Sequence, residues 1–176
     1  PKTTKSMIDA IAAKGFTTLR VPVRWDDHYS DSSKYMISAE YMDRVETVVN
    51  YGLANGMYVI LNVHHNDLQA AVSSSTSAQN KISEELAAIW KQIGTRFKNY
   101  GDKLIFEVNN EPRCGEDWTG NASYYKCVNA NNEAARAAIR ATGGNNAKRL
   151  IMLPTYCASG DAAKAEAWSN TSGDSM

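Results

Sequence analysis

The sequence has little that is typical of a membrane protein or a nucleic-acid-binding protein. It has no apolar run of about eighteen residues, so no transmembrane helix is expected. Its amino end, residues 1–6, lacks the apolar core of a signal peptide, so the signal of a secreted parent would lie outside this chain. The 19 basic residues balance the 19 acidic ones, and neither sign forms a block. This balance argues against nucleic acid or anionic lipid as partners and predicts a neutral ligand.

Cysteine is also scarce, which excludes a fold built around disulfides. The three cysteines, Cys114, Cys127 and Cys157, are too few for such a scaffold and lack the paired spacing of a zinc site. Cys114 and Cys127 flank a loop rich in Gly, Asn and Trp. A disulfide could close this loop, and free buried thiols are the alternative.

The 176 residues are expected to form one domain, residues 1–176, with an ordinary apolar content of 43%. Apolar periodicity predicts helices over residues 6–14, 38–55, 81–100, 124–142 and 161–168. Short β-branched and apolar runs predict strands over residues 16–23, 57–63, 104–110 and 149–153, and residues 73–80 are expected to form a polar loop. This alternation of helices and strands predicts a parallel sheet with right-handed crossovers.

Two α/β architectures are compatible with this order of helices and strands: an open doubly wound sheet, or part of a barrel of eight β/α units. No glycine-rich turn follows the first predicted strand, which argues against a nucleotide site. Polar residues near the carboxyl ends of successive strands favour the barrel, whose active sites lie at that end. These residues are Arg20, His64, His65, Asn110 and Glu111.

The third predicted strand ends in Asn110-Glu111-Pro112, where proline stops the ladder and leaves a carboxylate at the strand tip. A partly desolvated acid beside a carboxamide suits general acid/base catalysis of a reaction at a hydroxylated substrate. The alternative is an ordinary turn, in which Asn and Pro are common.

Arg20 interrupts an apolar strand, where a guanidinium requires acceptors. It either holds a catalytic carboxylate in its ionised state or makes a structural ion pair, for instance with Glu107. His64 shares a strand face with Asn62, so both are expected to point inward. A core histidine is the alternative for His64, although the adjacent His65 strengthens the functional interpretation.

Metals and organic cofactors are not expected. A zinc site could be drawn from His28, His64 and His65, but no metal-ligand spacing or cysteine partner supports it. Aromatic residues at or just beyond strand ends would suit stacking on sugar rings, and each could instead serve packing. They are Trp25, Tyr29, Trp118 and Tyr156.

Three segments, Gly15–Trp25, Val59–His65 and Ile105–Arg113, resemble motifs of glycoside hydrolase family 5, the endoglucanase family of clan A. They occur in the family's order and at compatible spacings, and the resemblance spans nearly the whole chain. It implies a (β/α)8 barrel, of which this chain provides about half: four parallel strands, approximately strands two to five, with their helices. It also implies an extracellular parent enzyme.

The resemblance implies roles for individual residues. Glu111 corresponds to the acid/base, Asn110 to the residue that contacts the sugar 2-hydroxyl, Arg20 to the arginine that orients the nucleophile, and His64 to the histidine that lines the cleavage subsite. The implied reaction is hydrolysis of internal bonds of cellulose or related β-glucans with retention, through a covalent glycosyl-enzyme. A mannanase or xylanase of the same clan is the alternative, because the acid/base motif does not determine the sugar. We expect Trp25, His65, Trp118 and Tyr156 to contact the substrate.

The sequence departs from the family at the second catalytic carboxylate. The family's nucleophile is a glutamate at the end of the seventh strand, and no matching segment is present. Glu116, Asp117 and Glu166 are carboxylates, but none of them ends an apolar strand. We therefore expect a segment that is inactive alone and that pairs with the remainder of the barrel or with a second copy. The alternative is a non-catalytic half-barrel that only assembles with another chain.

Overall fold

The computed structural model describes residues 3–64 and 71–169. Apart from the short strands β2 and β3, helices and strands alternate along this part of the chain, as expected. The helices are α1 (Lys5–Ala13), α2 (Ala39–Ala54), α3 (Thr76–Phe97), α4 (Ala122–Ala141) and α5 (Ala162–Ala167). The strands are β1 (Thr18–Val21), β2 (Tyr29–Asp31), β3 (Met36–Ile37), β4 (Tyr58–Asn62), β5 (Leu104–Glu107) and β6 (Ile151–Met152).

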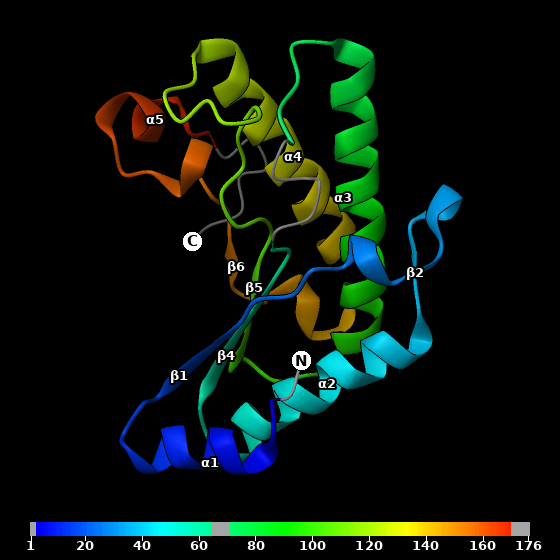
Figure 1. Cartoon of the computed structure of the whole chain (residues 1–176), viewed down its shortest axis with the longest axis vertical. Coiled ribbons are helices and arrows are strands. Elements are labelled where there is room, and N and C mark those ends of the chain that lie inside the picture. The colour runs from blue at the N-terminus through cyan, green and yellow to red at the C-terminus, as the bar shows by residue number, and fades with distance from the viewer. Residues whose placement is uncertain (1–2, 65–70, 170–176) are drawn as a thin grey trace.

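Four of the strands form a parallel sheet in the order β1-β4-β5-β6. One row across this sheet pairs Val21 with Leu61, Leu61 with Phe106, and Phe106 with Ile151. Each parallel connection contains a helix, and Figure 1 shows α2, α3 and α4 on the same side of the sheet. These elements form part of a (β/α)8 barrel, which confirms the predicted fold class.

The two faces of the sheet differ in burial because strand side chains alternate in direction. Val59, Leu61 and Phe106 face the helices and are fully buried. The next residues along the strands face the other way, and several of them are large apolar side chains that remain exposed. Tyr58 is 47% and Met152 43% exposed. This second face is the one that lines the interior of a closed barrel.

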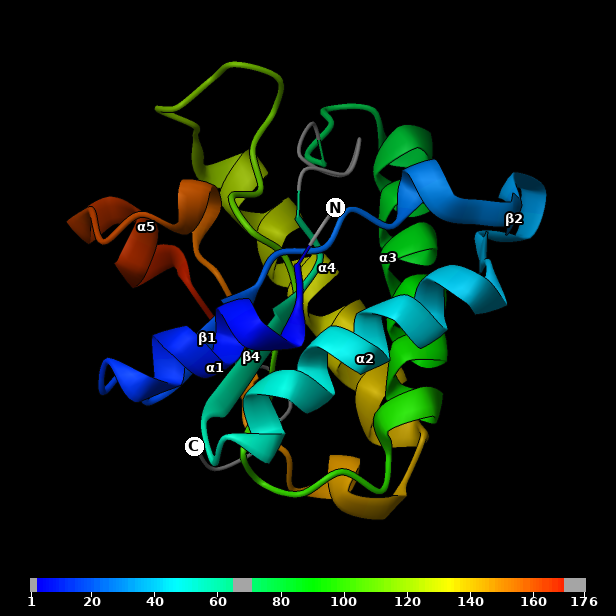
Figure 2. The ribbon, with the colours of Figure 1, turned by 60° about the horizontal axis from the view of Figure 1, so that its bottom comes forward.

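Local signals explain the end of α1 and the start of α2. The Ser38 hydroxyl accepts a hydrogen bond from the Tyr41 amide and caps α2, as its sequence predicts. Gly15, at φ 89°, follows α1 in the left-handed conformation that favours glycine. Helix α1 packs against α2 at the amino-terminal end of the sheet (Figure 2).

Helix α3 begins at Thr76, earlier than the predicted start at residue 81. The serine-rich segment expected as a loop is partly helical because its polar side chains bind other elements. Gln79 accepts a hydrogen bond from the Ser73 amide at 3.0 Å and donates one to Asn131 of α4 at 2.8 Å. The α3–α4 pair is thus joined by buried amides as well as by apolar contacts.

The antiparallel hairpin β2–β3 was not predicted from the sequence. Its strands are short and contain a register irregularity, so they give no periodic pattern. Contacts to Gln92 of α3 hold it in place: this side chain accepts from the Ile37 amide at 2.9 Å and donates to the Tyr35 carbonyl at 2.8 Å. The hairpin therefore depends on tertiary contacts.

Arg149 connects the loops at the amino-terminal end of the sheet and is only 4% exposed. Its guanidinium lies 4.9 Å from the Phe106 ring centre. Burial, with a smaller effect of the Arg140 charge, lowers the pKa of Arg149 to about 10. Its hydrogen bonds go to the Asn146 side chain and to the carbonyl oxygens of Phe97, Tyr100, Gly101 and Leu104.

Candidate active site

A network of charged and amide side chains crosses β1, β4 and β5 near the carboxyl ends of these strands. Arg20 Nε lies 2.8 Å from Glu107 Oε2, and its Nη2 lies 2.5 Å from Glu107 Oε1. Asn62 Nδ2 donates a third hydrogen bond to Glu107, at 3.2 Å. Glu107 is thus buried but accepts hydrogen bonds on both carboxylate oxygens, which makes its burial tolerable.

Arg20 connects this network to the Asn-Glu-Pro segment. Its Nη2 also donates to Asn110 Oδ1 at 2.7 Å, which sets the orientation of that amide. The hydrogen bonds to Glu107 raise the pKa of Arg20 further above its ordinary value. The ion pair with Glu107, one of the two interpretations of Arg20, is therefore present.

His64 lies just beyond the end of β4 and is joined to the same network. Its amide donates to the Val23 carbonyl at 2.8 Å, and its Nδ1 lies 3.1 Å from Asn62 Nδ2. Because Nδ2 of an amide can only donate, Nδ1 of His64 is the acceptor in this contact. His64 and Asn62 lie on the same strand face, as predicted.

Glu111 lies at the rim of an open cleft of 390 Å³ at this end of the sheet. Its side chain is 41% exposed, unlike that of Glu107. Arg20, Glu107, Asn109 and Asn110 form the polar part of the cleft lining, and the end of β6 and the segment after it form the apolar part. The apolar part consists of Met152, Leu153, Pro154 and Ala158, and it was not predicted to take part in the site.

Arg113 connects Glu111 to an aromatic side chain. Its Nη1 lies 3.6 Å from Glu111 Oε2 and its Nη2 3.6 Å from Glu116 Oε1. Its guanidinium carbon lies 4.1 Å from the ring centre of Trp118, whose side chain is half exposed. No role was predicted for Arg113, although it directly follows the Asn-Glu-Pro motif.

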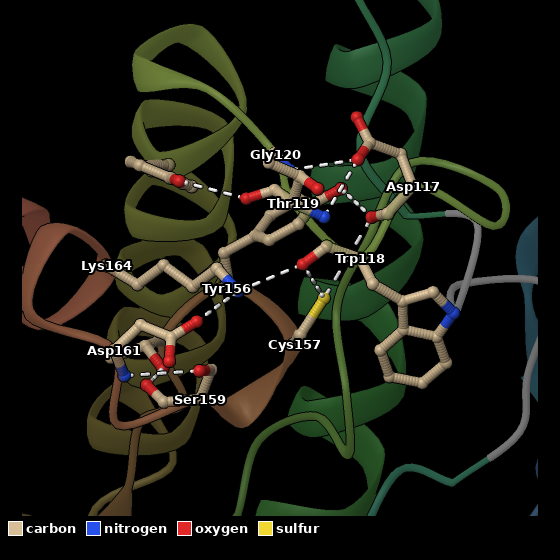
Figure 3. Close-up of polar contacts among 11 residues, drawn as sticks. Asp117, Trp118, Thr119, Gly120, Tyr156, Cys157, Ser159, Asp161 and Lys164 are labelled. Atoms are coloured by element: carbon tan, nitrogen blue, oxygen red, sulfur yellow. Dashed lines mark hydrogen bonds and ion pairs between the residues drawn. The ribbon is translucent and has the colours of Figure 1, made fainter.

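The loop that carries Trp118 is fixed by contacts from the segment after β6. Lys164 Nζ donates to the Trp118 carbonyl at 2.9 Å and to Asp161 Oδ2 at 2.8 Å. The Tyr156 hydroxyl donates to the Asp117 carbonyl at 2.5 Å. Figure 3 shows the Trp118 carbonyl directed toward Lys164 and Cys157, and the indole extending away from them. The backbone is thus restrained while the ring is presented on the outside.

The expectation that Trp25 and Tyr156 contact substrate is wrong for this structure, because both are buried in cores. Trp25 is 0% exposed, packs edge-on against Tyr41, and donates its indole N–H to the Asn62 carbonyl at 3.0 Å. Tyr156 is 1% exposed, and burial raises the pKa of its hydroxyl to about 12. Tyr29 donates its hydroxyl to Glu85 at 2.8 Å, so it also serves packing.

The other histidines and the cysteines lie in different surroundings. His65 lies outside the described residues. His28 stacks on Tyr41 with ring centres 3.5 Å apart, and residues 3–64 and 71–169 contain no group of three or more metal-ligating side chains. Cys114, Cys127 and Cys157 are free thiols, and Cys157 is buried. The free-thiol alternative therefore holds for the loop between Cys114 and Cys127.

A partial (β/α) barrel with an open carboxylate and an amide at the strand ends has the arrangement of a barrel-type active site. The model of the family described as "Cellulase (glycosyl hydrolase family 5)" matches residues 1–173. The chain therefore belongs to glycoside hydrolase family 5. The chain is 46% identical over 164 residues to endoglucanase A of Ruminococcus albus, covering 90% of this chain and 44% of that protein.

Solved structures agree with this assignment. A GH5-4 broad specificity endoglucanase from Clostridium cellulovorans is 50% identical, with a TM-score of 0.92 over 96% of this chain and 49% of that one. A xyloglucan-specific endo-β-1,4-glucanase from a metagenomic library, in complex with cellotriose, is 39% identical, with a TM-score of 0.91 over 98% of this chain and 52% of that one. The chain thus spans about half the length of these relatives. Within the described residues, no helix is long and apolar enough to cross a membrane.

Proposed function

We propose that this chain supplies the acid/base half of a retaining endo-β-1,4-glucanase site. Glu111 is the acid/base, Asn110 contacts the sugar 2-hydroxyl, and His64 lines the cleavage subsite. Arg20 holds Asn110 and Glu107 in place and orients the nucleophile. The substrate is an internal β-1,4 bond of cellulose or a related glucan. We place the parent enzyme outside the cell, where such polymers occur.

The observation that carries this proposal is the contrast between two carboxylates on one cleft. Glu111 is half open and faces the cleft, so it can exchange a proton with a substrate oxygen and with water. Glu107 is nearly enclosed, and its oxygens accept hydrogen bonds from Arg20 and Asn62. Those hydrogen bonds stabilise the negative charge of Glu107 and fix the orientation of its carboxylate, as expected for an anion with a structural role.

The reaction needs two carboxyl groups about 5 Å apart. In the first step, the nucleophile attacks the anomeric carbon while Glu111 donates its proton to the departing glycosidic oxygen. In the second step, Glu111 takes a proton from water, and the oxygen of that water replaces the enzyme carboxylate. We propose that the nucleophile comes from the remainder of the barrel, because Glu107 is already engaged.

Substrate contacts beyond the reacting centre come from Trp118, whose exposed indole offers a flat apolar face to a sugar ring. His65 is proposed as a further contact. The metagenomic relative solved with cellotriose is described as xyloglucan-specific, so xyloglucan is a second candidate substrate within the same reaction. The proposed mechanism requires no metal or organic cofactor, because the carboxylates provide both proton transfer and attack.

The proposed partner within the enzyme is the remainder of the barrel. The inner face of the sheet exposes apolar side chains, and strands β1 and β6 form its two edges. Additional strands would cover that face and pair with those edges. A second copy of the chain is the alternative occupant, and light scattering of the purified chain distinguishes a monomer from a dimer.

The test compares two proteins on carboxymethylcellulose. One is the 176-residue chain alone. The other, here called the completed enzyme, is this chain joined to the part of the Clostridium cellulovorans endoglucanase that it does not cover. We expect hydrolysis only by the completed enzyme, with the β-anomer as first product by NMR. An α-anomer would contradict retention, and hydrolysis by the chain alone would require a nucleophile among Glu107, Glu116, Asp117 and Glu166.

A further inference from the structure

Arg113 occupies an unusual position between the proposed acid/base and the aromatic ring beside it. Its side chain is only 11% exposed, yet it is close to two carboxylates that are much more open. The exposed fraction is 41% for the Glu111 side chain and 84% for that of Glu116. Its Nη1 also donates to the Glu111 carbonyl at 3.4 Å. The guanidinium therefore contacts both the backbone and the carboxylate of Glu111.

The flat side of Arg113 is used as well. The guanidinium carbon lies over the Trp118 ring at 4.1 Å, a cation–π contact in which a planar guanidinium, unlike an ammonium, can also stack on the indole. Among residues 3–64 and 71–169, Arg113 Nε is buried without an acceptor. A guanidinium placed only for stability would be expected to satisfy this donor, as all the nitrogens of buried Arg149 do.

Trp118 is a firm contact for Arg113 because its own backbone is restrained. Lys164 and Cys157 both approach its carbonyl, from the segment after β6 (Figure 3). The ring can therefore move mainly about its side-chain torsions, and Arg113 limits that movement. A sugar bound on the open part of the indole would press the ring onto the guanidinium.

We infer that Arg113 is a positioning residue that couples sugar binding at Trp118 to the orientation of Glu111. This inference rests on the proposed function. A bound sugar fixes the indole, the indole fixes the guanidinium, and the guanidinium holds the Glu111 carboxyl toward the glycosidic oxygen. Part of the binding energy of a remote sugar is thereby used at the reacting centre. Arg113 itself does not contact the substrate.

The test uses the completed enzyme and two substrates that differ only in the leaving group. Phenyl β-cellobioside needs a proton from the acid, whereas 2,4-dinitrophenyl β-cellobioside leaves without one. R113M should lower kcat/KM, which reports the first step, about tenfold on the phenyl substrate and by less than about twofold on the dinitrophenyl substrate. R113K, which keeps the charge and loses the planar face, should show a smaller loss on the phenyl substrate.

R136M is the matched control. Arg136 is similarly buried, with 14% of its side chain exposed, and pairs with Glu133 on α4, away from the cleft. This variant should keep both rates within about twofold, since general acid catalysis is untouched. Thermal melts of all variants check folding, and R113K supplies the answer if R113M does not fold.

A double-mutant cycle tests the coupling to Trp118. On cellotetraose, W118A combined with R113M should cost little more than the larger single change, because the two side chains act in one pathway. Additive losses would overturn the coupling, and equal losses on both aryl substrates would overturn the positioning of Glu111. If the completed wild-type enzyme is inactive, the proposed function fails and the role of Arg113 fails with it.

Discussion

The two faces of the parallel sheet serve different purposes although the same strands form both. The face toward α2, α3 and α4 contains Val59, Leu61, Leu104 and Phe106, all fully buried. The opposite face combines apolar side chains with Arg20, Asn62 and Glu107, and much of it is open. Polar residues on that face are costly unless they bind one another, and here they do. One face therefore provides stability, and the other provides a site whose polar groups are already oriented.

The largest effect is expected from Glu111→Gln on the open side. In the completed enzyme it should lower the rate on cellotetraose roughly 10²–10⁴-fold, because a carboxamide cannot deliver a proton. The free energy of unfolding should hardly change, since the side chain is 41% exposed. Steady-state kinetics and urea denaturation measure the two quantities. A large loss of stability would contradict the separation of the faces.

The second effect concerns the helix-facing side. Leu61→Ala should lower the free energy of unfolding by about 2–5 kcal/mol, because it removes buried methyl groups and leaves a cavity. No direct effect on chemistry is expected, so the folded completed enzyme should retain its kcat. Urea denaturation of the variant, with kinetics well below its midpoint, measures both. Unchanged stability would show that this face is not the core.

A smaller effect is expected from Glu107→Gln. It should change both activity and stability, whereas Glu111→Gln should change mainly activity and Leu61→Ala mainly stability. The amide keeps the shape but removes the charge that Arg20 contacts, so stability should fall by about 1–3 kcal/mol. Asn110 depends on Arg20 for its orientation, so kcat should fall too. Denaturation and kinetics of the completed enzyme test this. Loss of stability without loss of kcat would limit the ion pair to a structural role.

The smallest effect is expected from Leu150→Ala, the exposed counterpart of Leu61→Ala. Leu150 is 59% exposed, so the change should cost less than about 0.5 kcal/mol in the isolated chain. In the completed enzyme the cost should rise, because further strands would cover this face. Equal costs in both proteins would show that Leu150 lies outside the proposed contact with the rest of the barrel.

The sequence predicted the parallel order and the cluster at the strand ends because both depend on local pattern. Apolar runs ending in Asn62, Glu107 or Asn110 locate the strands, and parallel strands bring their carboxyl ends to one edge. Ser38 identified the start of α2 for an equally local reason.

Residues whose surroundings come from distant segments could not be assigned in this way. Trp25 and Tyr156 follow strands just as Trp118 does, yet only Trp118 is exposed. Their burial depends on Tyr41, Asn62 and Asp117, which are far from them in the sequence. The apolar part of the cleft lining, from Met152 to Pro154, was missed for a similar reason, because its place beside Glu107 follows from the pairing of β5 with β6.

Arg149 has a consequence for how freely the surrounding sequence can vary. Four of its acceptors are backbone carbonyls, at Phe97, Tyr100, Gly101 and Leu104. Every amino acid carries such a carbonyl, so a substitution at any of these positions leaves the acceptor itself in place. Replacement of Arg149 has no such tolerance, because lysine has three donors on one point and cannot reach four separate oxygens. This set of hydrogen bonds is therefore sensitive to substitution of Arg149 and tolerates substitution of the residues whose carbonyls it binds.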